Sequence, residues 1–333
     1  MDALLARVVG QDAAIREIVN VYQRHVAGMG DPMRPAGNLL LLGPTGTGKT
    51  RSVEAMAECL VDNARAVIKI DCGEFQHSHE IAKITGSPPG YLGHRETSPL
   101  LSQEALNQYH TEKVKLSIVL FDEIEKASVA VWNLLLGILD KATLTLGDNR
   151  KVDFSRALVF CTGNTGSREI ASNLAPPIGF SMPHIPDSAK LRGKIDKIAR
   201  GAAWKHFTPE FLNRFDAIVS FGPLSESDMA RILDLEISIV TDRTSTLTFS
   251  VTDGAKRFLL KEGIADPRMG ARGIKRVVER LIAGSIANLI VSGQSNPGDH
   301  IEIDVSDAAD DLAFYAVKVA KSVAQIASAS PAA

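Results

Sequence analysis

The sequence predicts an α/β fold with a parallel sheet covered by helices on both faces, followed by a smaller α+β domain. Two patterns carry this prediction. Short apolar runs alternate with helical patterns through most of the chain, which is typical of a parallel sheet with two buried faces. After Gly222-Pro223 the pattern changes to an amphipathic helix and an alternating strand. We therefore expect a large domain at 1–222, a small C-terminal domain at 223–320 and a frayed tail at 321–333.

The large domain opens on a strand, a loop and a helix. The run NLLLLG from Asn38 is continuously apolar, GPTGTGKT follows as a loop, and RSVEAMAECLV has the apolar spacing of a helix. Further buried strands are expected at Ala66–Cys72, Leu116–Glu123, Ala157–Asn164 and Ala217–Phe221. In the small domain we expect helices over SESDMARILDLEISIVTDR and ARGIKRVVERLIAGSIANLIVSG, and strands over TLTFSVT, HIEIDV and LAFYAVKV.

Composition and charge indicate which classes of partner the protein is not expected to bind. The chain has 37 basic and 39 acidic residues, so its overall field does not favour nucleic acid or an anionic membrane. No apolar run approaches the roughly 18 residues of a membrane-spanning helix. The three cysteines, Cys59, Cys72 and Cys161, form no close pair, which fits a reducing compartment. We expect a cytoplasmic protein that binds neither membrane nor nucleic acid.

The loop Gly43–Thr50 matches G-x-x-x-x-G-K-[ST], the pattern of a nucleotide phosphate loop. Its glycines let backbone N–H groups wrap the β-phosphate of ATP, while Lys49 neutralises phosphate charge and Thr50 ligates Mg²⁺. The alternative is a glycine-rich turn with an incidental lysine, which the position between a buried strand and a helix disfavours. The residues expected to bind the nucleotide here are Pro44, Thr45, Gly46, Thr47, Gly48, Lys49, Thr50 and Arg51.

Two acidic residues end the apolar strand IVLFDE. Beside a phosphate loop, Asp122 is expected to hold the Mg²⁺ shell with Thr50, and Glu123 to polarise the attacking water. Solvated carboxylates are common at strand ends, so this pair indicates ATP hydrolysis only together with the loop. The chain contains no nucleophile elbow, and we expect it to have no protease activity of its own.

Several further segments are distinctive: VVGQDAAI, RPAGNLLLLGPTGTGKT, GSPPGYLG, FDEIEKA, TPEFLNRFD and DPRMGARGIKR. In this order they resemble the AAA+ module of the Clp unfoldases, most closely the second ATPase module of ClpA, ClpB and ClpC. The resemblance runs from about Val8 to about Val305. It implies an AAA+ P-loop NTPase with a C-terminal lid domain, here as a stand-alone single module.

The resemblance implies further nucleotide contacts. Val9, Gly10 and Gln11 match the segment that cradles the adenine. Asn164, in CTGNTG, matches the polar sensor that orients the lytic water. Arg272, in GAR, matches the second sensor, which reaches from the small domain to the nucleotide of its own subunit. Such a contact would couple hydrolysis to domain rotation.

Arg214, in NRFD, matches the arginine finger of the family. A finger completes the site of a neighbouring subunit and cancels charge that develops on the γ-phosphate. Without the family context, this arginine would be interpreted as a member of a surface ion pair. The resemblance therefore implies a homo-oligomer, a hexameric ring in this family.

The segment SPPGYLG is not needed for ATP chemistry. Its Pro-Pro pair and flanking glycines indicate an exposed, semi-rigid loop. In the family this loop lines a central pore, where Tyr91 and Leu92 would grip an extended polypeptide substrate. A turn with a packed tyrosine is the alternative. The sequence HRETSPLL that follows departs from the Gly-Gly pair of the family.

Between Asn164 and Arg214 lies a Pro-rich segment without periodicity, GSREIASNLAPPIGFSMPHIPDSAK, which predicts a loop. Its tripeptide Ile178, Gly179 and Phe180 resembles the one with which ClpA, ClpC and ClpX dock the ClpP peptidase. Alternatively, this apolar tripeptide only pins the loop to the protein. Disaggregases of the ClpB type lack such a loop.

The sequence leaves several functions open. The first is a ring that threads polypeptide through its pore, either delivering it to a ClpP-like peptidase or working alone. A nucleic-acid motor or loader is disfavoured by the neutral charge. A switch that binds ATP without hydrolysing it is disfavoured because Glu123, Asn164 and Arg214 are all present. The substrate itself cannot be predicted from the sequence.

Overall fold

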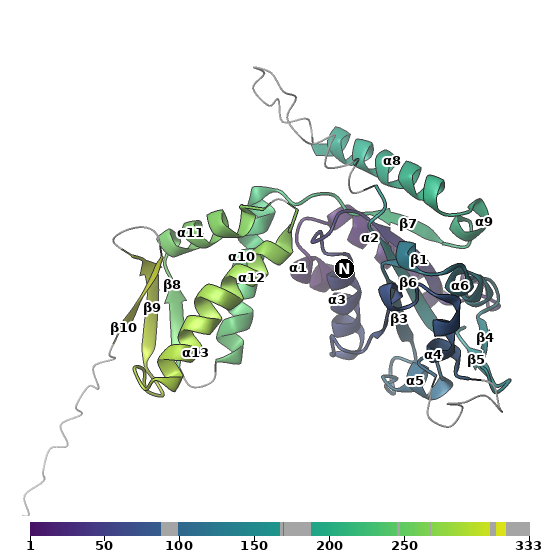
Figure 1. The fold of residues 1–333 in the computed structure, drawn as a ribbon, viewed down its shortest axis with the longest axis horizontal. Coiled ribbons are helices and arrows are strands. Elements are labelled where there is room, and N and C mark those ends of the chain that lie inside the picture. Colours follow the sequence, from purple (N-terminus) through teal and green to yellow (C-terminus); the bar gives the residue numbers. More distant parts are fainter. Residues whose placement is uncertain are drawn as a thin grey trace, which may run out of the picture. The chain divides into compact units, whose positions relative to one another are not determined.

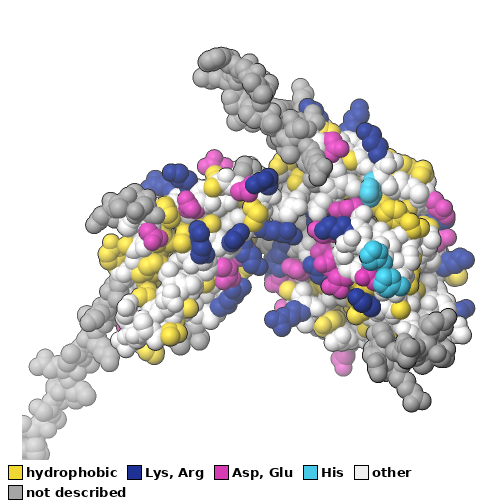
Figure 2. Space-filling view, viewed as in Figure 1, with side chains coloured by type: hydrophobic (Ala, Val, Ile, Leu, Met, Phe, Trp, Pro, Cys, Tyr) yellow, Lys and Arg dark blue, Asp and Glu magenta, His cyan; other side chains and the backbone are white. Residues whose placement is uncertain are grey.

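The computed structural model describes residues 1–87, 99–166, 169, 188–244, 247–266, 268–306 and 311–317. The chain divides into two units, Met1–Ser225 and Glu226–Ala333 (Figure 1). Within the described ranges, no helix is long and apolar enough to cross a membrane. Acidic and basic side chains lie next to each other over both units on the face shown in Figure 2.

The first unit is built on a five-stranded parallel sheet. Its strands are β1 (Gly37–Leu42), β2 (Ile68–Asp71), β3 (Ser117–Asp122), β6 (Ala157–Gly163) and β7 (Ala217–Ser220). They are ordered β2-β3-β6-β1-β7, and every neighbouring pair is parallel. Leu42 at the end of β1 lies opposite Gly163 of β6 and Ser220 of β7. The carboxyl ends of these strands therefore meet at one edge of the sheet.

Helices cover both faces of this sheet. Leu39 and Leu41 of β1 belong to one core and Leu40 and Leu42 to the other, and all four are fully buried. The first core includes α1 (Asp2–Arg7), α2 (Asp12–Val26) and α3 (Lys49–Val61). The second includes α4 (Ala82–Thr85), α5 (Gln103–Asn107), α6 (Val129–Lys141), α8 (Ser188–His206) and α9 (Pro209–Leu212). Burial on both faces explains the continuous apolar runs, and the predicted fold class is confirmed.

A hairpin that the sequence analysis did not predict precedes β6. Its strands β4 (Thr143–Thr145) and β5 (Lys151–Asp153) pair antiparallel. The N–H of Gly147, in its turn, donates to the carbonyl oxygen of Thr85 at 2.9 Å. A Cβ at Gly147 would lie 2.5 Å from the carbonyl oxygen of Gly86, so the hairpin rests directly on the end of α4. The described part of this unit also contains three short 3₁₀ turns: η1 (Cys72–Glu74), η2 (Ser78–Ile81) and η3 (Ile124–Lys126).

The second unit combines helices with a mixed sheet ordered β10-β9-β8, which confirms the expected smaller α+β domain. Its strands are β8 (Thr248–Val251), β9 (His300–Val305) and β10 (Leu312–Val317), and β9 runs parallel to β8 and antiparallel to β10. Its helices are α10 (Glu226–Arg243), α11 (Asp253–Ile264), α12 (Ala271–Val278) and α13 (Gly284–Val291). A π-helical turn, η4 (Glu279–Ala283), joins α12 to α13, where the sequence predicted one regular helix.

The close approach of α11 and α12 gives a test of this packing. A Cβ at Gly273 would clash with the carbonyl oxygen of Gly263, so we predict that Gly273→Ala lowers the free energy of unfolding by about 2 kcal/mol. Gly201→Ala on α8 is the matched control, because nothing lies within 4 Å of its added Cβ. There we expect a gain of about 0.5–1 kcal/mol from helix propensity. Chemical denaturation would measure both, and equal stabilities would contradict the close contact.

Candidate functional site

The loop between β1 and α3 turns on glycines. Gly43, Gly46 and Gly48 have φ angles of 151°, 76° and 98°, a range that favours glycine. A Cβ at Gly43 would lie 2.5 Å from the carbonyl oxygen of Phe221, so a side chain does not fit there. Gly48 caps α3, and Lys49 is the first residue of that helix. A tight loop that ends at a helix N-terminus is the arrangement that binds phosphate.

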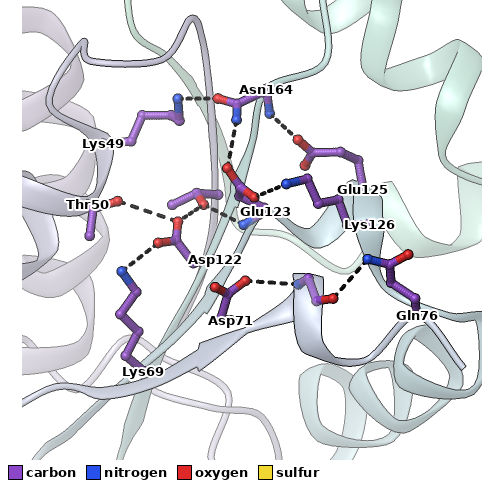
Figure 3. Close-up of polar contacts among 12 residues, drawn as sticks. Lys49, Thr50, Lys69, Asp71, Gln76, Asp122, Glu123, Glu125, Lys126 and Asn164 are labelled. Carbon is purple, nitrogen blue, oxygen red and sulfur yellow. Dashed lines mark hydrogen bonds and ion pairs between the residues drawn. The ribbon is translucent and has the colours of Figure 1, made fainter. Parts of the chain in front are cut away.

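Lys49 is buried, with only 7% of its surface exposed. Its Nζ donates to the carbonyl oxygens of Gly43 at 2.8 Å and Pro44 at 2.9 Å, and to Oδ1 of Asn164 at 2.8 Å (Figure 3). Burial of an ammonium group is costly unless the group is hydrogen-bonded. These acceptors therefore hold the amine at the end of β1, where the motif predicts the phosphates.

Asp122 ends β3 and accepts from several donors. Lys69 Nζ lies 2.8 Å from its Oδ2, and the hydroxyls of Thr50, at 3.4 Å, and Thr162 donate to its Oδ1. Burial works to raise the pKa of Asp122, but the bonds from Lys69 and Thr162 outweigh it and hold this pKa below its ordinary value. The carboxylate is therefore ionised at neutral pH. The oxygens of Thr50 and Asp122 fit Mg²⁺, which normally completes its shell with water and substrate phosphates.

Glu123 leaves the strand in a left-handed conformation, with φ of 58°. Its N–H donates to the hydroxyl of Thr162 at 3.0 Å. Its carboxylate accepts from Nδ2 of Asn164 at 3.4 Å and is ion-paired with Nζ of Lys126 at 2.5 Å (Figure 3). The hydrogen bond from Lys126 to Glu123, together with the negative charge of Glu123, raises the pKa of Lys126. Non-glycine residues at positive φ are uncommon and cluster at functional sites.

Asn164, directly after β6, connects these groups. Its Oδ1 accepts from Lys49 and its Nδ2 donates to Glu123. Its backbone N–H donates to Oε1 of Glu125 at 2.9 Å, which fixes the residue at the strand end. A continuous chain of contacts, Lys49–Asn164–Glu123, therefore links the phosphate loop to the second acidic residue.

The segment Val9-Gly10-Gln11 lies against the phosphate loop. Gln11 is buried, and its Nε2 donates to the carbonyl oxygens of Thr47 at 3.1 Å and Gly222 at 2.9 Å. Val9 is also buried, and Gly10 turns the chain with φ of 76°. The residues expected to hold the adenine are thus in hydrogen-bond contact with the loop expected to hold the phosphates. Within that loop the hydroxyl of Thr47 donates to the carbonyl oxygen of Pro44 at 2.9 Å. Arg51, on α3, is ion-paired with Glu58 of the same helix at 3.3 Å.

Arg214 belongs to the same unit but has other partners. Arg214 follows α9, and its guanidinium is ion-paired with Asp140 at 2.7 Å. Arg272 lies on α12 of the second unit and is exposed. Tyr91, Leu92, Ile178, Gly179 and Phe180 fall outside the residues that the structure describes.

Four residues that the motifs did not identify complete the site: Lys69, Glu125, Lys126 and Thr162. Thr162 carried a usable signal, because a hydroxyl inside the apolar strand ALVFCTG is buried and needs a partner. Glu125 and Lys126 lie in the distinctive segment FDEIEKA, but it assigned them no role, and Lys69 carried no signal because a charged residue on a strand is ordinarily solvated.

Two family models match the chain in the order of its two units. Residues 34–218 match the family described as AAA domain (Cdc48 subfamily). Residues 224–303 match the family described as the C-terminal, D2-small domain of ClpB protein.

Curated relatives and a solved structure agree with these matches. The chaperone protein ClpB of Corynebacterium efficiens is 36% identical over 92% of this chain and 32% of its own length. The probable chaperone protein ClpB 1 of Chlorobaculum tepidum is 37% identical over 91% of this chain and 66% of its own. The closed-state cryo-EM reconstruction of Hsp104 with ATPγS and FITC casein has a TM-score of 0.76 at 29% identity, covering 94% of this chain and 50% of that one. The chain thus spans about one third of the first relative's length.

The shared hydroxyl of Thr162 gives a test of the site. We predict that Thr162→Val lowers the rate of ATP hydrolysis roughly 10- to 100-fold, because Asp122 and the N–H of Glu123 both lose their common partner. Thr162→Ser keeps the hydroxyl and serves as the matched control. Phosphate release at saturating MgATP would measure the rates, with thermal unfolding as a check of folding. A valine variant as fast as the serine variant would show that the hydroxyl does not position these acids.

Proposed function

Because this chain belongs to the Clp-type AAA+ ATPases, we propose that it hydrolyses ATP and uses the energy, as a ring, to unfold or remodel other polypeptides. Two comparisons support the choice of substrate. The ClpB relatives are named as chaperone proteins, and the similar Hsp104 structure contains a nucleotide analogue together with casein, a polypeptide.

The Lys49–Asn164–Glu123 chain is the observation that carries the ATPase proposal. A lysine that binds the γ-phosphate gives up its bond to Asn164, so the amide becomes available to hold the attacking water beside Glu123. Glu123 then accepts the proton of that water. Lys126 pairs with Oε2 of Glu123 and Asn164 donates to Oε1, so the two contacts would orient the carboxylate toward the water.

Thr50 and Asp122 would hold Mg²⁺, which supplies positive charge for the phosphates when bound. The carboxylate of Asp122 is prepared for this role, because Lys69 and Thr162 keep its pKa low. The segment Val9-Gly10-Gln11 would cradle the adenine next to the loop. ATP and Mg²⁺ are therefore the proposed ligands.

Arg214 would complete the site of a neighbouring subunit. About a third of its side chain is exposed, at 35%, and in its own subunit it pairs with Asp140 instead of the phosphate loop. A cation delivered to the γ-phosphate stabilises the charge of the transition state. Hydrolysis would then depend on assembly, and the family resemblance points to a homo-hexamer.

Mechanical work would come from two further parts of the chain. The resemblance of GSPPGYLG to a pore loop assigns Tyr91 and Leu92 to contact with the substrate polypeptide. The resemblance of GAR assigns Arg272 to the nucleotide of its own subunit, through which hydrolysis would rotate the second unit.

The remodelled polypeptide has two proposed fates. The tripeptide Ile178, Gly179 and Phe180 would hand it to a ClpP-like peptidase, and without that contact it would be released for refolding or disassembly. The ClpB chaperones among the relatives favour release, whereas the ClpC ATP-binding subunit of a Clp protease is 36% identical over 91% of this chain. Docking of a peptidase is therefore the alternative to be tested.

The ring mechanism makes hydrolysis depend on Arg214. We predict that ATP promotes assembly to six chains and that Arg214→Ala lowers hydrolysis by about 1000-fold while ATP still binds. The rate of ATP hydrolysis and the mass would be measured on the same sample, the mass by light scattering with and without ATP. Arg243→Ala is the control, because this arginine pairs with Glu279 on the surface of the second unit, and its rate should match wild type. A monomer that hydrolyses ATP regardless of Arg214 would rule out the ring.

The choice between release and degradation depends on the tripeptide. We predict that deletion of Ile178, Gly179 and Phe180 leaves ATPase activity and unfolding of a tagged fluorescent protein unchanged. Addition of a ClpP-type peptidase should cause no ATP-dependent degradation with either variant. Degradation by wild type that is lost on deletion would instead establish docking and replace the release proposal.

A further inference from the structure

The turn that carries Arg214 is held by residues from distant parts of the first unit. Arg34 Nη2 donates to the carbonyl oxygen of Arg214 at 2.5 Å, and Arg34 Nε donates to that of Leu139 at 3.3 Å. Its Nη1 lies 3.6 Å from Oδ1 of Asp216. One guanidinium therefore joins the segment before β1, the end of α6 and the turn before β7.

Asn38 makes the same connection from inside the protein. It is fully buried, and its Nδ2 donates to the carbonyl oxygens of Leu139 at 3.0 Å and Arg214 at 3.3 Å. Its backbone also exchanges two bonds with Asp216: the N–H of Asn38 donates to Oδ2 at 2.8 Å, and the N–H of Asp216 donates to the carbonyl oxygen of Asn38 at 2.8 Å. The carbonyl of Arg214 thus receives one charged and one neutral side-chain donor, and neither bond is part of the sheet ladder.

The other end of Arg214 is held by Asp140, at 2.7 Å. Asp140 follows Leu139 near the end of α6. The guanidinium of Arg214 pairs with Asp140, and the backbone carbonyl of Arg214 shares its donors with the carbonyl of Leu139. Both parts of Arg214 are therefore connected to the same short stretch of that helix. The guanidinium also lies 4.0 Å from Oε1 of Glu210 on α9, so its direction depends on how the turn is held against α6 and α9. Arg34 and Asn38 hold the turn against α6, since each binds the carbonyls of Leu139 and Arg214 together.

We propose that Arg34 and Asn38 are positioning residues for Arg214, which keep its turn where the guanidinium can reach the γ-phosphate of a neighbouring subunit. The inference rests on the proposed function, because it requires a finger that acts between subunits. Position matters here, since a displacement of about 1 Å can cost on the order of 100-fold in rate. If Arg34 and Asn38 only stabilised the fold, their substitution would lower the stability of each subunit. It would not change the position of the Arg214 that the subunit offers to its neighbour.

Arg34→Lys tests the geometry with little change in charge. Lysine is a compact point donor and cannot bind two carbonyls and a carboxylate as the planar guanidinium does. We expect kcat for ATP to fall roughly 10-fold or more, with KM unchanged because the phosphate loop is intact. Arg200→Lys is the matched control: Arg200 pairs with Asp196 at 2.9 Å and donates to the carbonyl oxygen of Ile218 in β7 at 2.5 Å, so its bonds go to neither Arg214 nor Leu139. Equal kcat for the two variants would overturn the inference.

Mixed rings separate positioning from stability. Lys49→Ala subunits have an inactive site but an intact Arg214, whereas Arg34→Met subunits have an intact site and a displaced Arg214. We expect the mixture to hydrolyse ATP severalfold faster than the sum of the separate samples. The sites of Arg34→Met subunits would then be completed by their Lys49→Ala neighbours.

Arg214→Ala mixed with Lys49→Ala is the reference for this experiment. If Arg214→Ala is rescued and Arg34→Met is not, the inference is wrong and the proposed function stands. If Arg214→Ala itself is not rescued, no finger acts between subunits, and both fail. Should Arg34→Met not fold, Asn38→Ser removes the buried amide donors and is taken through the same mixture with the same two outcomes.

Discussion

The burial of one ammonium group constrains the nucleotide site more than any other interaction. Lys49 loses water, so it needs acceptors at fixed distances. Gly43 and Pro44 supply two of them from a loop whose turns require glycine. Asn164, 115 residues further along the chain, supplies another and also donates to Glu123. The amine therefore connects the loop after β1 with Asn164 and, through Asn164, with Glu123.

The sheet order makes this convergence possible. β6 lies between β1 and β3 in a wholly parallel sheet, so the residues that follow all three strands emerge at the same edge. Thr162, near the end of the middle strand, bonds Asp122 and the backbone of Glu123 on the neighbouring strand. An antiparallel partner would have placed one of these strand ends at the opposite edge. The parallel order is thus a requirement of the chemistry as well as of the packing.

Contiguous chemistry was predictable from the sequence, and chemistry assembled by tertiary contacts was not. The phosphate loop, the acidic pair and the apolar strands are local patterns, so the fold class and the central residues could be predicted. The partner Lys69 could not, because it lies 53 residues from Asp122, whereas Lys126 lies three residues after Glu123 in FDEIEKA and its spacing alone assigned it no role. The hairpin Thr143–Asp153 was missed because strands of three residues are too short to show a period. Asn38 was interpreted only as the start of an apolar strand, although its buried amide binds two distant carbonyls.

Under the proposed mechanism, the two ends of β1 contact parts of two different ATP sites, one in the neighbouring subunit and one in its own. At one end Asn38 binds the turn of Arg214, which acts on the neighbour's ATP, and at the other Gly43 opens the subunit's own phosphate loop. β1 is an interior strand, with ladder bonds to β6 and β7 on its two sides, which restrain it from bending. A force on the Arg214 turn would therefore reach the phosphate loop through a single strand about 17 Å long. Communication between adjacent sites then needs no hinge within the first unit, because the element that holds the finger is also the element that presents Lys49.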